Sequence, residues 1–218
     1  MVCRQAGQTL KIQYNEDSVE FPSLGFSTDI SKDLVIVVPD TWNCNTLEID
    51  AAAADVQIID LTINELDFDG ASGKLILDNC NIADLDIDTA SGDVEFSGVL
   101  KNLDFDAASA KFCGEFLAMP NRLNIDTMSG NMDIVLPEDC RFICELEAMN
   151  GSFNTDFSTT QENGTYIHGG TDNACQIKIS AMSGDVSILK GVADPQYTAT
   201  DCTETGCTET SHSHNNHH

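Results

Sequence analysis

A twelve-residue motif that recurs seven times constrains the fold of this chain more than any other feature. One copy reads LDIDTASGDVEF from Leu85, and the others resemble it closely enough to align without gaps. The copies begin at Leu47, Leu66, Leu85, Leu103, Leu123, Cys144 and Ile177, at steps of 19, 19, 18, 20, 21 and 33 residues. Repeats of this length are typical of solenoids, in which each repeat buries its apolar face only by stacking on its neighbours.

Within each copy, apolar residues alternate with polar ones. The first and third positions are apolar, as in Leu85 and Ile87, and the residues beside them are mostly Asp. A second apolar pair follows, as in Val94 and Phe96. This period of two predicts strands with one buried face. A helix is excluded because no 3.6-residue period is present and because Asp, Thr, Ser and Gly are poor helix formers.

A corner separates the two apolar pairs of each copy. The seventh and eighth positions read Ser-Gly in four copies and Asn-Gly in a fifth. Glycine there predicts a tight turn with positive φ. The predicted turn residues are Gly73, Gly92, Gly130, Gly151 and Gly184. Ala54 and Ala110 take the same position in the two remaining copies.

These patterns predict an all-β, parallel β-solenoid of about 19-residue coils, with two strands per coil and essentially no helix. Residues 34–191 form the predicted repeat domain, residues 1–33 a cap or the end of upstream coils, and residues 192–218 a disordered low-complexity tail. The runs TLKIQY and LVIVV read as strands ahead of the first motif. The sixth position changes from Ala to Met at Met128, Met149 and Met182, which predicts a core that widens toward the later coils.

The charge of the chain restricts its partners. Asp and Glu total 36 against 10 Lys and Arg, a formal charge of −26. Nucleic acids and anionic membrane surfaces are excluded as partners, because both bind clustered Lys and Arg. No apolar run approaches the length of a membrane span. Cations, basic surfaces and neutral glycans remain as partners, with end-to-end self-association of coils as a further alternative.

Acidic residues recur at the second and fourth positions, which point outward. The predicted cation-binding face comprises Asp50, Asp67, Asp69, Asp86, Asp88, Asp104, Asp106 and Asp126. No cofactor is predicted other than calcium, which this face could bind. The glycine-rich repeat of calcium-binding β-rolls is absent. The alternative is a solvated face that aids solubility and blocks edge pairing.

Other candidate ligands and nucleophiles are few. The tail carries His212, His214, His217 and His218, which bind metal weakly at most because their spacing matches no closed site. His168 is expected in an exposed loop. The nine cysteines contain no CxxC pair and read mostly as small reduced hydrophobes. No catalytic residue is predicted, because the aspartates recur in every coil and a catalytic pair would break the repeat.

The repeated L-x-I-x-x-x-SG-D-V-x-I motif, ending in IKISAMSGDVSIL, resembles the bacterial putative-adhesin family of β-solenoid domains over residues 34–190. The resemblance implies a secreted or envelope-associated domain without known catalytic residues. We therefore expect a non-enzymatic binding or scaffold domain of the cell surface, located there through a signal or anchor outside this sequence. The alternatives are a carbohydrate-active β-helix enzyme, lyase or hydrolase, and a cytoplasmic assembly module.

Overall fold

The computed structural model describes residues 2–6, 9–13, 34–39, 42–191, 200–203 and 206–209. The chain divides into two compact units, Met1–Val37 and Val38–His218. In the first unit, strand β1 (Val2–Ala6) pairs antiparallel with β2 (Thr9–Gln13), which confirms the strand predicted in TLKIQY. The other predicted strand, LVIVV, is wrong: residues 34–39 are not in a strand, because a strand needs a ladder partner and no other described residue pairs with them.

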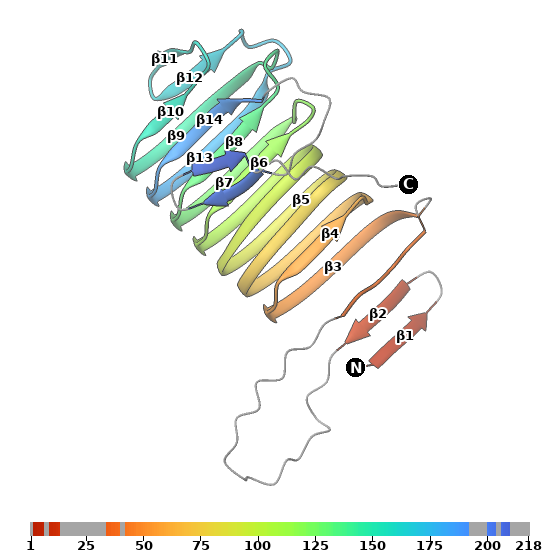
Figure 1. The fold of residues 1–218 in the computed structure, drawn as a ribbon. Helices are drawn as coiled ribbons and strands as arrows, with labels where there is room; N and C mark the ends of the chain where they lie inside the picture. Colours follow the sequence, from red (N-terminus) through yellow and green to blue (C-terminus); the bar gives the residue numbers. More distant parts are fainter. Residues whose placement is uncertain are drawn as a thin grey trace, which may run out of the picture. The chain divides into compact units, whose positions relative to one another are not determined.

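The second unit is built on a strongly curled sheet of twelve strands (Figure 1). Its strands are β3 (Asn43–Ala53), β4 (Val56–Ile59), β5 (Thr62–Ser109), β6 (Phe112–Phe116), β7 (Arg122–Ser129), β8 (Met132–Leu136), β9 (Phe142–Asn150), β10 (Phe153–Thr155), β11 (Thr160–Glu162), β12 (Thr165–His168), β13 (Cys175–Ser183) and β14 (Val186–Lys190). Only the pairings β11–β12 and β12–β9 are antiparallel in this sheet. The described residues contain no helix. The all-β, helix-free prediction is confirmed.

Strand β5 is 48 residues long and passes through several repeats without interruption. We expected each corner to separate two strands, but here the ladder continues through the corners. β3 pairs with β5 up to Ser72, and β4 pairs with it again from Leu75. Between these two pairings the backbone N–H of Lys74 is accepted by Asp55 Oδ1, so the corner keeps a hydrogen bond to the neighbouring coil.

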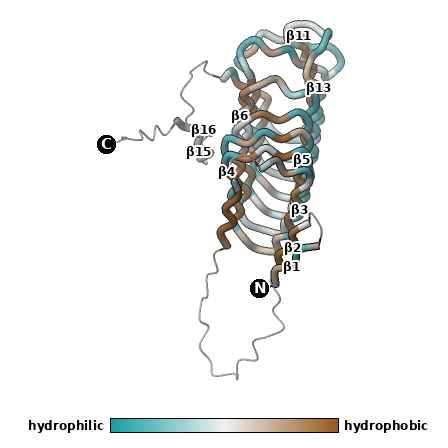
Figure 2. Tube along the Cα trace, turned by 90° about the vertical axis from the view of Figure 1, so that its right-hand side faces the viewer, coloured by the Kyte–Doolittle hydropathy of each residue, from teal (hydrophilic) through white to brown (hydrophobic). Residues whose placement is uncertain are grey.

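Equivalent positions of neighbouring repeats lie opposite one another. Leu47 pairs with Leu66, and Leu103 pairs with Leu123. Side chains at the first and third positions therefore stack inside the curled sheet, where Ile87 and Phe105 are fully buried. Figure 2 shows the resulting alternation of apolar and polar residues along the chain. The predicted inward residues are confirmed, apart from partial exposure in the outermost strands.

The last two repeats are stacked in an order that differs from their order in the sequence. Strand β13 lies between β7 and β9, so Ile177 pairs with both Leu123 and Cys144. On the other side of the corner, β14 likewise lies between β8 and β10. The sixth repeat in the sequence is therefore the outermost of the stack, and the seventh lies between it and the fifth. The 33-residue step between the sixth and seventh repeats provides the length for this return.

The segment that makes the return also covers the end of the sheet. Strand β12 pairs antiparallel with β9, and β11 pairs with β12. His168 lies on β12 rather than in the exposed loop that we expected. Its Nδ1 lies 2.9 Å from the carbonyl oxygen of Ser158, and its ring packs on Phe157 and Phe142. A short antiparallel hairpin at this end limits further strand addition.

The sixth position faces solvent, so the predicted widening of the core is wrong. The exposed fractions of Met128, Met149 and Met182 are 59%, 77% and 51%. The fifth position faces inward instead, as at Thr127 and Ala181, which are buried. The physical reason is that strand alternation continues up to the corner, so the sixth side chain points the same way as the second and fourth.

The positive φ predicted for the five corner glycines is confirmed at four of them and is wrong at the fifth. Positive φ values occur at Gly73, Gly130, Gly151 and Gly184, between 119° and 148°. Gly92 does not have positive φ. A Cβ there would lie 2.6 Å from the carbonyl oxygen of Gly73. Glycine at position 92 thus serves the close approach of two neighbouring coils rather than an unusual backbone angle.

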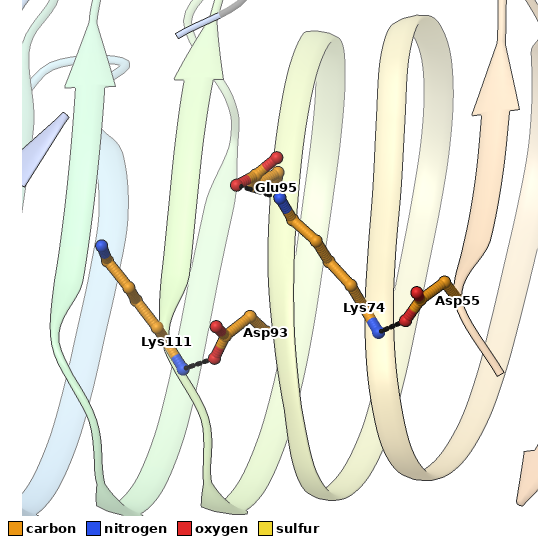
Figure 3. A network of polar contacts seen from close by, with 5 residues as sticks. All are labelled: Asp55, Lys74, Asp93, Glu95 and Lys111. Carbon is orange, nitrogen blue, oxygen red and sulfur yellow. Dashed lines mark hydrogen bonds and ion pairs between the residues drawn. The ribbon is translucent and has the colours of Figure 1, made fainter. Parts of the chain in front are cut away.

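The Asp that follows the corner links neighbouring coils (Figure 3). Asp55 Oδ1 accepts the backbone N–H of Lys74 at 2.9 Å, and Asp93 Oδ1 accepts that of Lys111 at 3.1 Å. Asp185 accepts both the backbone N–H and the hydroxyl of Ser152, at 2.8 and 2.7 Å. These hydrogen bonds give the Asp that follows the corner a structural role that the sequence pattern did not show.

Replacing Asp93 with Ala should destabilise the chain by about 1 kcal/mol, because the Lys111 N–H loses its acceptor. The Asp93→Asn variant is the matched control, since its amide oxygen can still accept this hydrogen bond. Urea unfolding of both variants measures the difference. Equal stability of the Ala and Asn variants would contradict the linking role.

Outside the sheet, strands β15 (Thr200–Thr203) and β16 (Gly206–Glu209) pair antiparallel. We expected no regular structure after residue 191, and these two segments differ from that expectation. Antiparallel neighbours can pair through a very short connection, which a low-complexity sequence permits. The four tail histidines lie outside the described residues.

Candidate binding groove

A long groove of about 1270 Å³ runs along the outer face of the curled sheet. It is lined by the fourth, fifth and sixth positions of all seven repeats, and so crosses every coil of the stack. Its lining residues are Asp50, Ala51, Ala52, Asp69, Gly70, Ala71, Asp88, Thr89, Ala90, Asp106, Ala107, Ala108, Asp126, Thr127, Met128, Glu147, Ala148, Met149, Ser180, Ala181 and Met182. The groove is thus a product of the repeat itself.

The three positions make a floor and two walls. The fifth position supplies the floor, because Gly70 has no side chain and small side chains such as that of Ala107 pack inward against the core. Glycine at position 70 leaves room for the ring of Phe68, which would lie 2.7 Å from an added Cβ. The fourth and sixth positions point outward on either side, about 7 Å apart along each strand. A small-residue floor between two outward rows leaves the surface hollow.

We call the row at the fourth position the carboxylate wall. In spatial order it consists of Asp50, Asp69, Asp88, Asp106, Asp126, Ser180 and Glu147. Asp50 lies opposite Asp69, and Asp106 lies opposite Asp126. None of the five aspartates forms a hydrogen bond or ion pair with another residue that the structure describes. The groove therefore has one wall of uncompensated negative charge.

The crowding of these carboxylates affects their protonation. Burial raises the pKa of the Asp106 carboxyl, and the neighbouring charges of Asp126, Asp88 and Asp104 raise it further. Burial likewise raises the pKa of Asp86, with Asp104 as the largest charged contributor. Both shifts have the sign expected for like charges brought together on adjacent strands.

The row at the sixth position forms the second wall, which we call the apolar wall. In spatial order it consists of Ala52, Ala71, Ala90, Ala108, Met128, Met182 and Met149. Because β13 lies between β7 and β9, Met182 lies between the other two methionines. Three exposed thioether side chains therefore follow one another at one end of the groove. We missed this cluster in the sequence, although strict alternation from Leu123 to Met128 would have placed Met128 outside.

The predicted acidic face separates into two groups. Asp50, Asp69, Asp88, Asp106 and Asp126 line the groove. Asp67, Asp86 and Asp104 do not line it. Asp104 is also partly compensated, because it accepts a hydrogen bond from Asn124 Nδ2 at 2.7 Å and lies 3.6 Å from Arg122 Nη1. The groove, rather than the whole face, is the candidate binding surface.

No group of three or more His, Cys, Asp or Glu side chains in the described segments is arranged to hold a metal ion. Calcium binding by the acidic face therefore stays a prediction. The buried cysteines make poor nucleophiles, because burial raises the pKa of Cys80 and Cys140 to about 11 and that of Cys144 and Cys175 to about 12. These thiols stay protonated at neutral pH and pack as small hydrophobes.

Comparisons with known proteins identify one matching family. The profile of the Toastrack DUF4097 family matches residues 3–189. Among solved structures, a putative cell adhesion protein from Clostridium sporogenes aligns with 15% identity and a TM-score of 0.37, covering 62% of this chain and 57% of that one. This chain thus spans less than two thirds of that protein. None of the curated proteins matches. No helix in the described residues has the length and apolarity needed to span a bilayer.

Proposed function

The chain belongs to the Toastrack DUF4097 family, and from that premise we propose that it is a non-enzymatic binding or scaffold domain of the cell surface. The observation that carries the proposal is the groove of about 1270 Å³, which crosses all seven repeats. Sites for small substrates are usually compact clefts with a few convergent polar groups. A long groove that is lined by the same three repeat positions in every coil suits an extended partner.

The proposal treats the repeating unit as a coil of about 19 residues with two strands, joined at the Ser-Gly corner. In such a unit every coil contributes the same three positions to the groove. The aspartates are then equivalent members of one wall rather than a distinct acid and base. Because the same positions recur along the groove, it can make many similar contacts with a partner. A catalytic site would instead need one distinct group of residues at one point.

The partner classes follow from charge. A chain with a formal charge of −26 repels nucleic acid and anionic membranes, so basic protein surfaces, neutral glycans and cations such as calcium remain. The resemblance to adhesin-like domains favours a location at the cell surface. Self-association end to end is disfavoured at the end covered by β11 and β12, because β11 is a three-residue strand that offers little edge for pairing.

Binding of the labelled, purified chain to intact cells and to immobilised cell-wall glycans tests this function. We expect saturable binding that the unlabelled chain displaces, and no release of new reducing ends or unsaturated sugars from the glycans. Accessibility of the protein on intact cells to added protease tests the location. Glycan turnover that disappears on replacing one aspartate would instead establish the carbohydrate-active alternative.

A further inference from the structure

The dimensions of the groove match an extended polypeptide lying along the stack of strands. Neighbouring strands of a sheet lie about 4.8 Å apart, so seven rows extend over about 29 Å. An extended chain rises about 3.3 Å per residue, and about nine residues would fill this length. The two walls lie about 7 Å apart along each strand, which leaves room for a single backbone between them.

The two walls differ in chemistry, and an extended chain presents two different sides. Successive side chains of a strand point to opposite sides. A segment that lies between the walls therefore directs every second side chain toward the carboxylate wall and the others toward the apolar wall. Basic residues suit the first set of positions and apolar residues the second. The groove is complementary to a sequence in which basic and apolar residues alternate.

The charge of the carboxylate wall favours such an occupant strongly. Asp50, Asp69, Asp88, Asp106 and Asp126 are consecutive, and no basic side chain lines the groove among the described residues. The raised pKa of Asp106 reflects mutual repulsion as well as burial. Lysine or arginine side chains opposite this wall would relieve the repulsion, and each long side chain can reach more than one carboxylate.

The apolar wall supplies a second and independent feature. Met128, Met182 and Met149 are exposed side by side at one end, although large apolar side chains usually avoid such exposure when they are clustered. Methionine side chains adapt their shape to different apolar groups and are frequent on surfaces that bind peptides. The alanines at the other end keep the wall shallow. Larger apolar side chains would therefore lie at the methionine end.

We propose that the groove binds an extended polypeptide segment in which lysine or arginine alternates with apolar residues. This inference rests on the proposed binding function and adds the chemistry of the partner. Basic side chains lie along the carboxylate wall, and apolar side chains lie along the apolar wall. The backbone runs over the small-residue floor, across the strands of the sheet.

Fluorescence anisotropy with labelled nine-residue peptides tests the proposal. One peptide alternates lysine and valine, and the matched control has the same composition with all lysines first and all valines last. We expect the alternating peptide to bind at least tenfold more tightly at physiological salt. Equal affinity would show attraction between net charges only and would overturn the proposal. A linear polyamine that binds as tightly as the alternating peptide would overturn it as well.

Two double variants of equal charge locate the binding surface. Asp88→Asn with Asp106→Asn removes two carboxylates from the groove, whereas Asp67→Asn with Asp86→Asn removes two from the outer face beside it. The first pair should weaken binding of the alternating peptide at least tenfold, and the second less than threefold. Equal losses would place the peptide outside the groove and overturn the proposal.

Thermal unfolding of each variant confirms that it is folded before binding is measured. The experiments distinguish an error in the peptide-binding proposal from an error in the proposed surface-binding function. A chain that still binds cells or glycans saturably, but does not distinguish the two peptides, would retain its surface-binding role without this partner.

Discussion

Replacing Gly130 with Ala is expected to destabilise the protein by about 3 kcal/mol, which combines about 1–2 kcal/mol of backbone strain with a steric conflict. The φ of Gly130 is 139°, a region that residues with a Cβ rarely adopt. An added Cβ would also lie only 1.6 Å from the carbonyl oxygen of Ala110 in the neighbouring coil. Because that oxygen belongs to the backbone, relief of the conflict requires the two coils to move apart. Urea unfolding monitored by circular dichroism measures the loss.

Two other glycines separate these contributions. Gly164 has φ of 85° but no atom within 4 Å of an added Cβ, so Gly164→Ala should cost only the strain, about 1 kcal/mol. Gly92 lacks positive φ but lies close to Gly73, so Gly92→Ala tests the approach of the coils alone. A Gly130→Ala variant no less stable than Gly164→Ala would show that close stacking at the corner is unimportant.

Replacing Asp88 and Asp106 together with Asn is expected to stabilise the chain by about 2 kcal/mol at low salt. Carboxylates on adjacent strands lie about 4.8 Å apart, and two unit charges at that distance repel by about 0.9 kcal/mol in water. The double variant removes three of the four nearest-neighbour contacts among the five aspartates. Salt screens the repulsion in the parent chain, so the difference in melting temperature should shrink as sodium chloride is added.

The control for this experiment removes the same charge elsewhere. Glu162→Gln with Asp172→Asn alters two exposed carboxylates outside the groove, and we expect less than about 0.5 kcal/mol of change from it. If the control stabilises as much as the groove variant, net charge rather than the carboxylate wall is responsible. Calcium chloride compared with sodium chloride at equal ionic strength tests the calcium proposal, which requires an additional rise in melting temperature.

The same crowding predicts the pH dependence of stability. The folded-state pKa values of Asp86 and Asp106 are raised above the ordinary value of 3.8. A carboxyl with a raised folded pKa binds its proton more tightly in the folded state, so stability rises as pH falls from neutral through that pKa. Asp185 acts in the opposite direction: hydrogen bonds from Ser152 lower its pKa, and the stability that they contribute is lost as pH falls below 3.8. Maximum stability is therefore expected in mild acid.

The local pattern of the sequence was sufficient to predict the class of fold and the burial of most side chains. Alternation with a period of two assigns each side chain to one face of a strand, and this depends only on backbone geometry. Leu66, Ile87 and Phe105 are buried for that reason. The same rule applied through the sixth position would have placed Met128 outside, but the change from Ala to Met was interpreted as a change in core size.

Which strands become neighbours was decided by the tertiary structure alone. Seven similar repeats can stack in more than one order, because each presents nearly the same apolar residues and ladder groups to its neighbour. The sequence order of β9 and β13 is reversed in space, and this reversal brings Met182 between Met128 and Met149. The groove is likewise a property of the assembled stack, since its walls exist only when the fourth and sixth positions of adjacent repeats align. Periodicity in sequence thus determined the face that each residue occupies, whereas long-range pairing determined its neighbours.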